Sequence, residues 1–357
     1  MDQIWWNHII KAHTFLEDIV SLIVQGSSIL LSLPPTIPWR NTLMELVSES
    51  LRMENSKNKL EEIECPDKDP GLYLLEHFCK EATRAKYRYG MNCAQFLGRC
   101  QETVLNDRYI WVSNIPGDKI EQWLDFVVEY NASIDYKTPG IFILEVCDDS
   151  IVRKKKKGIK NIVFNQTIGT YDVYTFCALV ASETQCKEYL RPYLAEMVSS
   201  ICGDDVELCA ECVSRGIEFL KDPVETIAKV IEKSHRSNGE KYSFYKNKEE
   251  IILSIWESQI KYIFPLIEKY RRYFVNCYGN MIKQLLPISN SYGEQVIVPE
   301  DVEIGTLLYL VKKGDIVISS TEYEELERFR NARNKLAHMT VLENNELDII
   351  LREGKHK

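Results

Sequence analysis

The sequence predicts an α/β domain with a mostly parallel sheet, followed by an all-helical domain. Two apolar runs, Ser28–Leu33 and Ile141–Val146, have the length of strands and the continuous hydrophobicity of strands buried on both faces. Helical stretches alternate with these runs, as they do in three-layer α/β domains. From about Cys186 the apolar periodicity is helical only.

The α/β elements are expected within residues 1–185. Strands are expected at 28–33, 109–113, 141–146 and 161–165, and helices at 4–24, 41–52 and 171–181, with one more helix opened by a capping box at Asp118–Glu121. Because parallel strands need long crossover connections, these helices should cover both faces of the sheet.

Two further segments complete the predicted organisation. Residues 186–238 are expected to form a helical extension that ends at the polar stretch Ser234–Gly239, and residues 239–357 a separate helical domain. The latter should contain a long amphipathic stretch over 249–286, broken only by Pro265. The last helix of this domain is expected to begin with a capping box at Thr321–Glu324 and to run through His338.

The chain is acidic overall, but its charge is unevenly distributed. The 357 residues include 44 Lys and Arg and 53 Asp and Glu, which gives a formal net charge of −9. General nucleic-acid coats are basic, so this balance argues against that class. Residues 241–357 carry 17 basic and 17 acidic side chains, so all of the excess negative charge lies upstream. A local RNA site near the C-terminal end is therefore compatible with the composition.

No membrane segment or leader is expected. Met1–Gln3 lacks the basic start of a signal peptide, and charged side chains interrupt the apolar stretch Phe15–Leu33. The 11 cysteines have no scaffold spacing, which indicates reduced, buried thiols in a cytoplasmic protein. Cys209 and Cys212 form a CxxC pair on one helical face with Cys202, which favours a core position over a metal site, and no cofactor is expected.

The segment after the first apolar run has the layout of a phosphate-binding loop without its chemistry. A working loop uses glycines to bring backbone N–H groups to phosphate, followed by a lysine and a Ser or Thr. Leu33–Arg40 has no glycine and three prolines, which have no N–H to donate. Arg40 is expected to be a solvated surface arginine, with a phosphate contact as the alternative.

These features resemble a degenerate P-loop ATPase fold. Glu145, on the run Ile141–Val146, resembles the acidic residue that holds Mg²⁺ in such folds, at a position where aspartate is commoner. The resemblance implies an α/β scaffold that does not hydrolyse ATP. A nucleotide-sensing domain that still binds ATP is the alternative.

The sharpest chemical signal is the hexapeptide RNKLAH at residues 333–338. Self-cleavage of RNA by a 2′-hydroxyl needs a base for the hydroxyl proton and a cation for the charge that develops on phosphate. His338 suits the first task and Arg333 the second. Asn334 and His338 are four residues apart and share a helical face, so Asn334 is expected to orient the imidazole or a phosphate oxygen.

This motif resembles the Arg-x₄₋₆-His signature of HEPN domains, which usually place a polar residue after the arginine. Trp256–Arg271 resembles the long first helix of such a domain, and Phe329–His338 the motif helix. The resemblance implies a metal-independent endoribonuclease that dimerises to build its site, with catalytic roles for Arg333, Asn334 and His338. Glu257 is a weaker candidate that could face the same cleft, or an ordinary solvated residue.

The resulting hypothesis is a HEPN-type endoribonuclease in antiviral defence or a toxin-like system. RNA is the expected partner, together with a second copy of the chain bound through the C-terminal domain. Arg333 and His338 lie about 140° apart around an ideal helix, which favours a site shared by two chains. The α/β domain would sense a trigger or dock a regulatory protein. The alternative is an inactive HEPN and pseudo-ATPase adaptor within a multiprotein defence complex.

Overall fold

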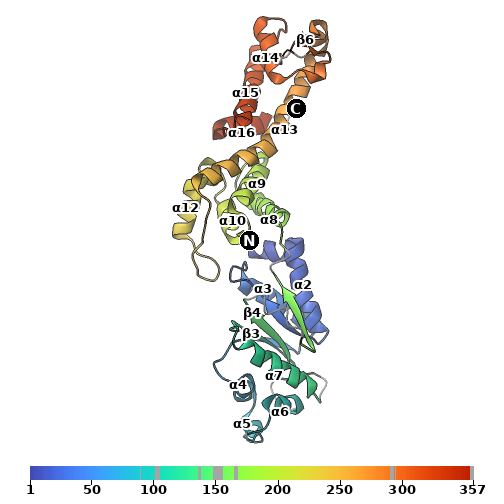
Figure 1. Ribbon diagram of the computed structural model, residues 1–357, viewed down its shortest axis with the longest axis vertical. Helices are drawn as coiled ribbons and strands as arrows, with labels where there is room; N and C mark the ends of the chain where they lie inside the picture. The colour runs from blue at the N-terminus through green and yellow to red at the C-terminus, as the bar shows by residue number, and fades with distance from the viewer. Residues whose placement is uncertain are drawn as a thin grey trace. The chain divides into compact units, whose positions relative to one another are not determined.

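The computed structural model describes residues 1–88, 90–100, 105–135, 138–147, 156–164, 168–289, 293 and 295–353. The chain forms two compact units, Met1–Asp172 and Val173–Lys357 (Figure 1). The first contains a parallel sheet with helices and the second is largely helical, which confirms the predicted fold class at this level. The segments 186–238 and 239–357 lie together in the second unit.

The first unit is built on a five-stranded parallel sheet in the order β2-β3-β4-β1-β5. The strands are β1 (Ser28–Ser32), β2 (Lys59–Glu64), β3 (Arg108–Ser113), β4 (Ile141–Val146) and β5 (Ile159–Val163). All residues of β1 are buried, as expected for a strand between two neighbours. β2 has no counterpart among the predicted strands, because its sequence KLEEIE buries only Ile63 and shows no apolar run.

Helices cover both faces of this sheet. They are α1 (Asp2–His8), α2 (Ile10–Val24), α3 (Arg40–Glu54), α4 (Pro70–Phe78), α5 (Glu81–Arg84), α6 (Cys93–Arg99) and α7 (Ile120–Ala132). One core contains Leu30, Ile110 and Phe142 from the strands, packed with residues of α4, α6 and α7. α2 packs on β1 and α3 on β2, on the opposite face. The result is a three-layer α/β arrangement.

The predicted capping box at Asp118–Glu121 is wrong. α7 begins at Ile120, and no side chain caps its N-terminus. A turn closed by the hydrogen bond from the Lys119 N–H to the Pro116 carbonyl (3.0 Å) leads directly into the helix. The Lys119 ammonium donates to Asp67 Oδ1 at 2.6 Å, so a hydrogen bond to another loop also stabilises this turn.

The second unit is an assembly of helices. They are α8 (Thr170–Glu183), most of which lies in this unit, η2 (Glu188–Leu190), α9 (Arg191–Cys202), α10 (Val206–Ser214), α11 (Ile217–Lys221), α12 (Pro223–Lys233), α13 (Lys248–Leu285), η3 (Pro299–Asp301), α14 (Ile304–Lys313), α15 (Ser320–Ala337) and α16 (Asn344–Glu353), with a short pair β6 (Ile288–Ser289) and β7 (Gln295–Val296). α13 corresponds to the predicted stretch 249–286 and continues through Pro265. α9 and α15 both pack against α13, as Figure 1 shows.

The polar stretch Ser234–Gly239, predicted to be a domain boundary, is bound to α10. Arg236 forms an ion pair with Asp205, and its guanidinium lies 5.2 Å from the ring centre of Tyr242. The N–H of Ser237 donates to Glu207 Oε2 at 2.9 Å. Polar residues that suggest a free linker in the sequence therefore serve as anchors in the fold.

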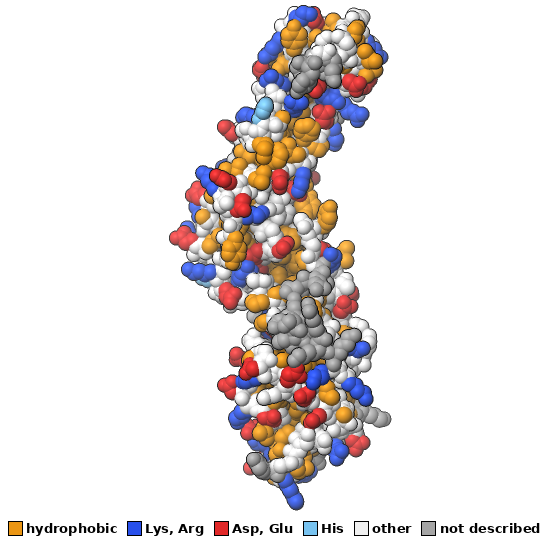
Figure 2. Space-filling model, viewed as in Figure 1, with side chains coloured by type: hydrophobic (Ala, Val, Ile, Leu, Met, Phe, Trp, Pro, Cys, Tyr) orange, Lys and Arg blue, Asp and Glu red, His pale blue; other side chains and the backbone are white. Residues whose placement is uncertain are grey.

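Figure 2 shows blue Lys and Arg side chains interspersed with red Asp and Glu side chains on the visible face, and they do not gather into one basic patch. Within the part of the chain that the structure describes, no helix is long and apolar enough to span a bilayer.

Candidate functional site

The motif helix α15 begins two residues earlier than predicted. Its capping box is Ser319–Glu322, in which the Glu322 N–H donates to Ser319 Oγ at 3.2 Å and the Ser319 N–H donates to Glu322 Oε2 at 2.9 Å. The predicted box at Thr321–Glu324 is therefore wrong. The Tyr278 hydroxyl donates to Glu322 Oε1 at 2.6 Å, which ties the start of α15 to α13 and explains why the earlier box forms.

One face of α15 belongs to the core. Leu326, Phe329, Ala332 and Leu336 are buried, and Phe329 stacks on Tyr270 of α13 with ring centres 4.1 Å apart. This face fixes the rotation of the helix about its axis. The motif side chains consequently lie on or beside the outer face.

The three predicted site residues differ in exposure. His338 is exposed, whereas Asn334 and Arg333 are partly buried, with 38% of the Arg333 side chain accessible. Arg333 Nη2 lies 3.9 Å from Glu303 Oε2, whose side chain is 60% accessible, so this ion pair is long and well solvated. The side chains of Arg333 and His338 are therefore both available to a ligand.

His338 occupies the C-terminal cap of α15 in a Schellman arrangement. The Thr340 N–H donates to the Lys335 carbonyl at 2.9 Å, and the Met339 N–H donates to the Leu336 carbonyl at 3.2 Å. Met339 has a φ of 56°, the left-handed conformation in which glycine is usual. A side chain at this position is disfavoured, so the backbone next to His338 is held by its surroundings.

α13 provides that support. The Trp256 indole N–H donates to the Leu336 carbonyl at 2.8 Å. The buried Gln259 side chain donates to the Leu342 carbonyl at 3.1 Å and accepts from the Leu342 N–H at 2.7 Å. Together these bonds hold the chain on both sides of His338. We call Trp256 and Gln259 the α13 clamp.

Within one chain, the three site residues are only partly brought together. Asn334 and His338 are one turn apart, and the His338 N–H donates to the Asn334 carbonyl at 3.1 Å. Arg333 lies about 140° away from His338 around the helix. No hydrogen bond joins the three side chains to each other in the described ranges. Glu257 on α13 is exposed, and in the described ranges no hydrogen bond or ion pair joins its side chain to the three site residues.

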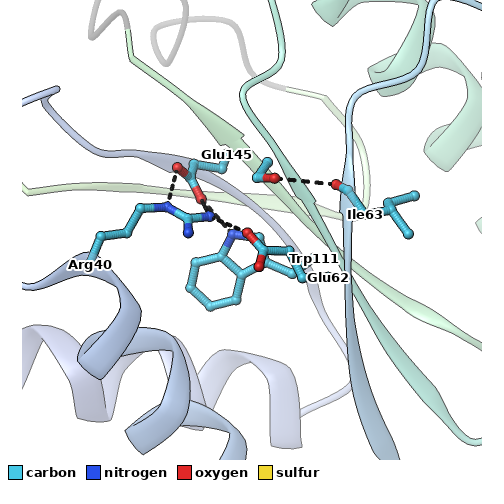
Figure 3. Close-up of polar contacts among 6 residues, drawn as sticks. Arg40, Glu62, Ile63, Trp111 and Glu145 are labelled. Carbon is cyan, nitrogen blue, oxygen red and sulfur yellow. Dashed lines mark hydrogen bonds and ion pairs between the residues drawn. The ribbon is translucent and has the colours of Figure 1, made fainter. Parts of the chain in front are cut away.

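A second polar cluster lies at the sheet, where Figure 3 shows Arg40 reaching from the start of α3 to the strands. Its Nε donates to Glu145 Oε1 at 2.8 Å and its Nη2 to Glu145 Oε2 at 2.6 Å. The Trp111 indole N–H donates to the same Glu145 Oε2 at 2.6 Å, and Arg40 Nη2 also donates to Glu62 Oε1 at 2.7 Å. We call these four residues the sheet cluster.

The sheet cluster corrects the expectation for Arg40, which is neither a solvated arginine nor free for phosphate. Burial opposes its charge, but the hydrogen bonds and negative charge of Glu145, with a smaller contribution from Glu62, raise the pKa of Arg40 above its ordinary value. The Glu145 side chain is only 4% accessible. The carboxylate on β4 is therefore balanced by the protein's own guanidinium, at the position where Mg²⁺ would otherwise be expected.

The roles of Trp111 and Glu62 in this cluster were not predicted. Trp111 lies in a strand of buried residues and has the appearance of ordinary core, and Glu62 lies in the unpredicted strand β2. In the parallel register, Glu62 pairs with Trp111 and Trp111 with Ile143, two residues before Glu145. Side chains two apart on a strand share a face, so the register alone would have brought the three together.

The CxxC cysteines are buried, as predicted. Cys202, Cys209 and Cys212 have relative exposures of 8%, 0% and 0%. Hydrogen bonds among the thiols, which include Cys177, and burial raise the pKa of all three well above the ordinary value, so they are protonated at neutral pH. Among the described residues, no group of three or more His, Cys, Asp or Glu side chains is arranged to hold a metal ion.

Comparison with known proteins gives no family assignment. No protein-family model matches the chain, and no curated protein sequence matches it significantly.

Proposed function

We propose that the protein is a metal-independent endoribonuclease of the HEPN type, in which Arg333, Asn334 and His338 cut RNA. The observation that carries the proposal is the state of the C-terminal end of α15. There an exposed imidazole and a weakly paired guanidinium lie on a backbone held by the α13 clamp. A nucleophile-activating base on a rigid support is what catalysis by positioning requires.

The proposed reaction is transesterification. His338 accepts the proton of a ribose 2′-hydroxyl, whose oxygen forms a bond to the adjacent phosphorus. Arg333 binds the non-bridging oxygens, where negative charge increases in the transition state. The bond from phosphorus to the 5′ oxygen breaks, and that oxygen leaves with a proton taken from water. The products carry a 2′,3′-cyclic phosphate and a 5′-hydroxyl, and no metal ion takes part.

A homodimer would complete this site. Leu253, Trp256, Ile260 and Phe264 follow one another at helical spacing along α13, and the side chains of Leu253 and Phe264 remain exposed at 42% and 36%. This apolar stripe includes the Trp256 that binds the end of α15. A second copy packed there on a two-fold axis would bury the stripe beside both motifs.

The first unit is proposed to sense a trigger or dock a regulatory protein. Its sheet has the layout of a nucleotide-binding fold. However, Arg40 occupies the place of a metal cation beside Glu145, and a proline-rich turn stands where such folds have the phosphate-binding loop. An antiviral or toxin-like role follows from pairing such a regulatory unit with a ribonuclease.

The test is cleavage of total RNA by the purified protein in EDTA. We expect cleavage by wild type and a loss of about 10²–10⁴-fold in His338→Ala, as for other acid–base groups. His8→Ala removes an exposed histidine of the other unit and serves as the matched control. A strict need for a divalent ion, or cleavage of a strand with a 2′-deoxy sugar at the cut site, would refute the mechanism. No cleavage under any condition would favour the inactive adaptor.

The shared site has its own test. Arg333→Ala and His338→Ala chains, each inactive alone, are mixed and allowed to exchange subunits. In a composite site one of the two sites in each mixed dimer regains both residues, so about a quarter of wild-type activity should return. No recovery, or full activity of a monomer, would contradict the shared site.

A further inference from the structure

A row of polar residues extends the motif toward the middle of α15. Arg330, Asn334 and His338 are spaced at i, i+4 and i+8, so they follow one another along one side of the helix. At 100° per residue, Arg330 lies between Arg333, about 60° to one side, and His338, about 80° to the other. Around the helix axis, the positively charged Arg330 therefore lies between Arg333 and His338. We call Arg330, Asn334 and His338 the α15 row.

The basic residues around this row differ in their partners. Arg328 Nη2 lies 3.2 Å from Glu353 Oε1, and Lys335 Nζ lies 2.7 Å from Glu346 Oε1. Arg330, in contrast, has no carboxylate at ion-pair distance among the described residues, and its Nη1 donates to the Asn331 amide oxygen at 3.1 Å.

The nearest acidic neighbour in the sequence is also engaged. Glu327, three residues before Arg330, accepts a hydrogen bond from Lys312 at 3.1 Å, and this bond, with a smaller effect of the Arg330 charge, lowers the pKa of Glu327. Arg330 is therefore a partly exposed guanidinium that forms no close ion pair among the described residues, whereas Arg328 and Lys335 on the same helix do.

We infer that Arg330 binds another phosphate of the same RNA strand, close to the one that is cut, so that the strand runs along the α15 row. This inference rests on the proposed function. Arg330 and His338 are about 12 Å apart along the axis, which is too far for one phosphate and suits two phosphates of one strand. Asn334 lies between them, at the place where a connecting nucleotide would pass.

A single RNA strand fits the row better than an acidic protein segment. The row combines a planar guanidinium fork, which matches phosphate oxygens, with an amide and an imidazole, which bond to sugar hydroxyls and phosphates alike. The apolar contacts that a protein interface would need lie elsewhere, on the stripe of α13.

The experiment measures binding of a fluorescent mixed-sequence 20-nucleotide 2′-O-methyl RNA, which cannot be cut, at 50 to 200 mM KCl. Arg330→Gln is compared with Arg272→Gln, which removes the same charge from an exposed site of α13. Arg272 is about 200° round the helix from Tyr270, the residue that stacks on Phe329, and so faces away from α15.

In Arg330→Gln we expect the slope of log affinity against log salt to fall by about 0.7, the value for one phosphate contact on a single strand. The affinity lost over this fourfold range of salt then shrinks by about 2.5-fold, and Arg272→Gln leaves the slope unchanged. Equal slopes for Arg330→Gln and wild type, with wild-type binding intact, overturn the inference alone and point to a protein ligand for Arg330. Absence of RNA binding and cleavage by the wild type overturns the proposed function and this inference together.

Discussion

Replacement of Glu145 by glutamine tests whether the sheet cluster stabilises the first unit. The substitution keeps the size of the side chain and one acceptor for the Trp111 indole, but it removes the charge that two donors of Arg40 bind at 2.8 and 2.6 Å. Removing one partner of a buried pair typically costs about 3–5 kcal/mol. Because Arg40 is 23% accessible and keeps Glu62, we expect the lower end, about 3 kcal/mol.

Glu62→Gln is the matched control. It removes a carboxylate from the same guanidinium, but the Glu62 side chain is 34% accessible, against 4% for Glu145. Solvent screens such a pair, so we expect a loss of only about 0.2–1 kcal/mol. The two variants therefore differ in burial and not in charge.

The assay is urea denaturation of the full chain, followed by tryptophan fluorescence. Five of the six tryptophans (residues 5, 6, 39, 111 and 123) belong to the first unit, so the signal reports mainly on that unit. A loss of about 3 kcal/mol should lower the midpoint by about 1–2 M urea, whereas Glu62→Gln should shift it by less than about 0.5 M. Equal shifts for the two variants would refute the reasoning, because burial would then have no effect.

The same cluster predicts a pH dependence. The folded-state pKa of Arg40 is raised above its ordinary value, so its contribution to stability is fully present at any pH below that ordinary value. It is lost only as the pH rises through the folded-state pKa, far above the working range. The contribution of Arg40 to the free energy of unfolding should therefore be the same at pH 7 and pH 9. A contribution at pH 9 of half the value at pH 7 would contradict this role of Arg40.

Three further predictions concern other parts of the chain. Met339→Gly should stabilise the second unit by about 1 kcal/mol, because glycine adopts the left-handed backbone conformation of this position without strain, at some cost in unfolded-state entropy. Ala337→Gly should destabilise the same unit. Thermal unfolding measures both variants, and a loss of stability in Met339→Gly would contradict the strain. Native protein should react with a disulfide reagent at pH 8 first at the exposed Cys277 and more slowly at the exposed Cys147, because burial raises the pKa of the Cys147 thiol, so fast labelling that survives their joint replacement by serine would count against the fold. ATP turnover should stay at background, because Leu33–Arg40 offers neither glycine nor lysine, and turnover abolished by Arg40→Ala would overturn this.

The sequence was most informative where a segment is buried along its whole length. β1 and β4 are continuous apolar runs, so their place in the centre of a parallel sheet could be predicted. β2 was missed, since an edge strand with a single buried residue has no periodicity to detect. The order of the strands depends on long-range pairing, which local patterns do not encode.

Local ambiguity explains the error at the start of α15. Ser319–Glu322 and Thr321–Glu324 both have the spacing of a capping box, and the sequence alone gives each the same weight. The hydrogen bond from Tyr278 of α13 to Glu322 distinguishes them. It joins residues 44 positions apart and is therefore invisible to any local window. The motif itself was easier to find, because Arg333, Asn334 and His338 lie within a single helix and its cap.

The distance between Arg333 and His338 gives the strongest argument for a second chain in the site. Five residues along a helix rise about 7.5 Å, and a rotation of about 140° at the radius of the side chains adds a chord of about 10 Å. Side chains that point outward therefore end about 13 Å apart. One phosphate bound through two hydrogen bonds of about 2.8 Å does not span that gap. The α13 clamp opposes bending of the helix end, because Trp256 and Gln259 hold the chain on both sides of His338. If the two residues act on one phosphate, the arginine and the histidine must therefore come from different chains, and Arg330 is the cation left to guide the strand along each chain.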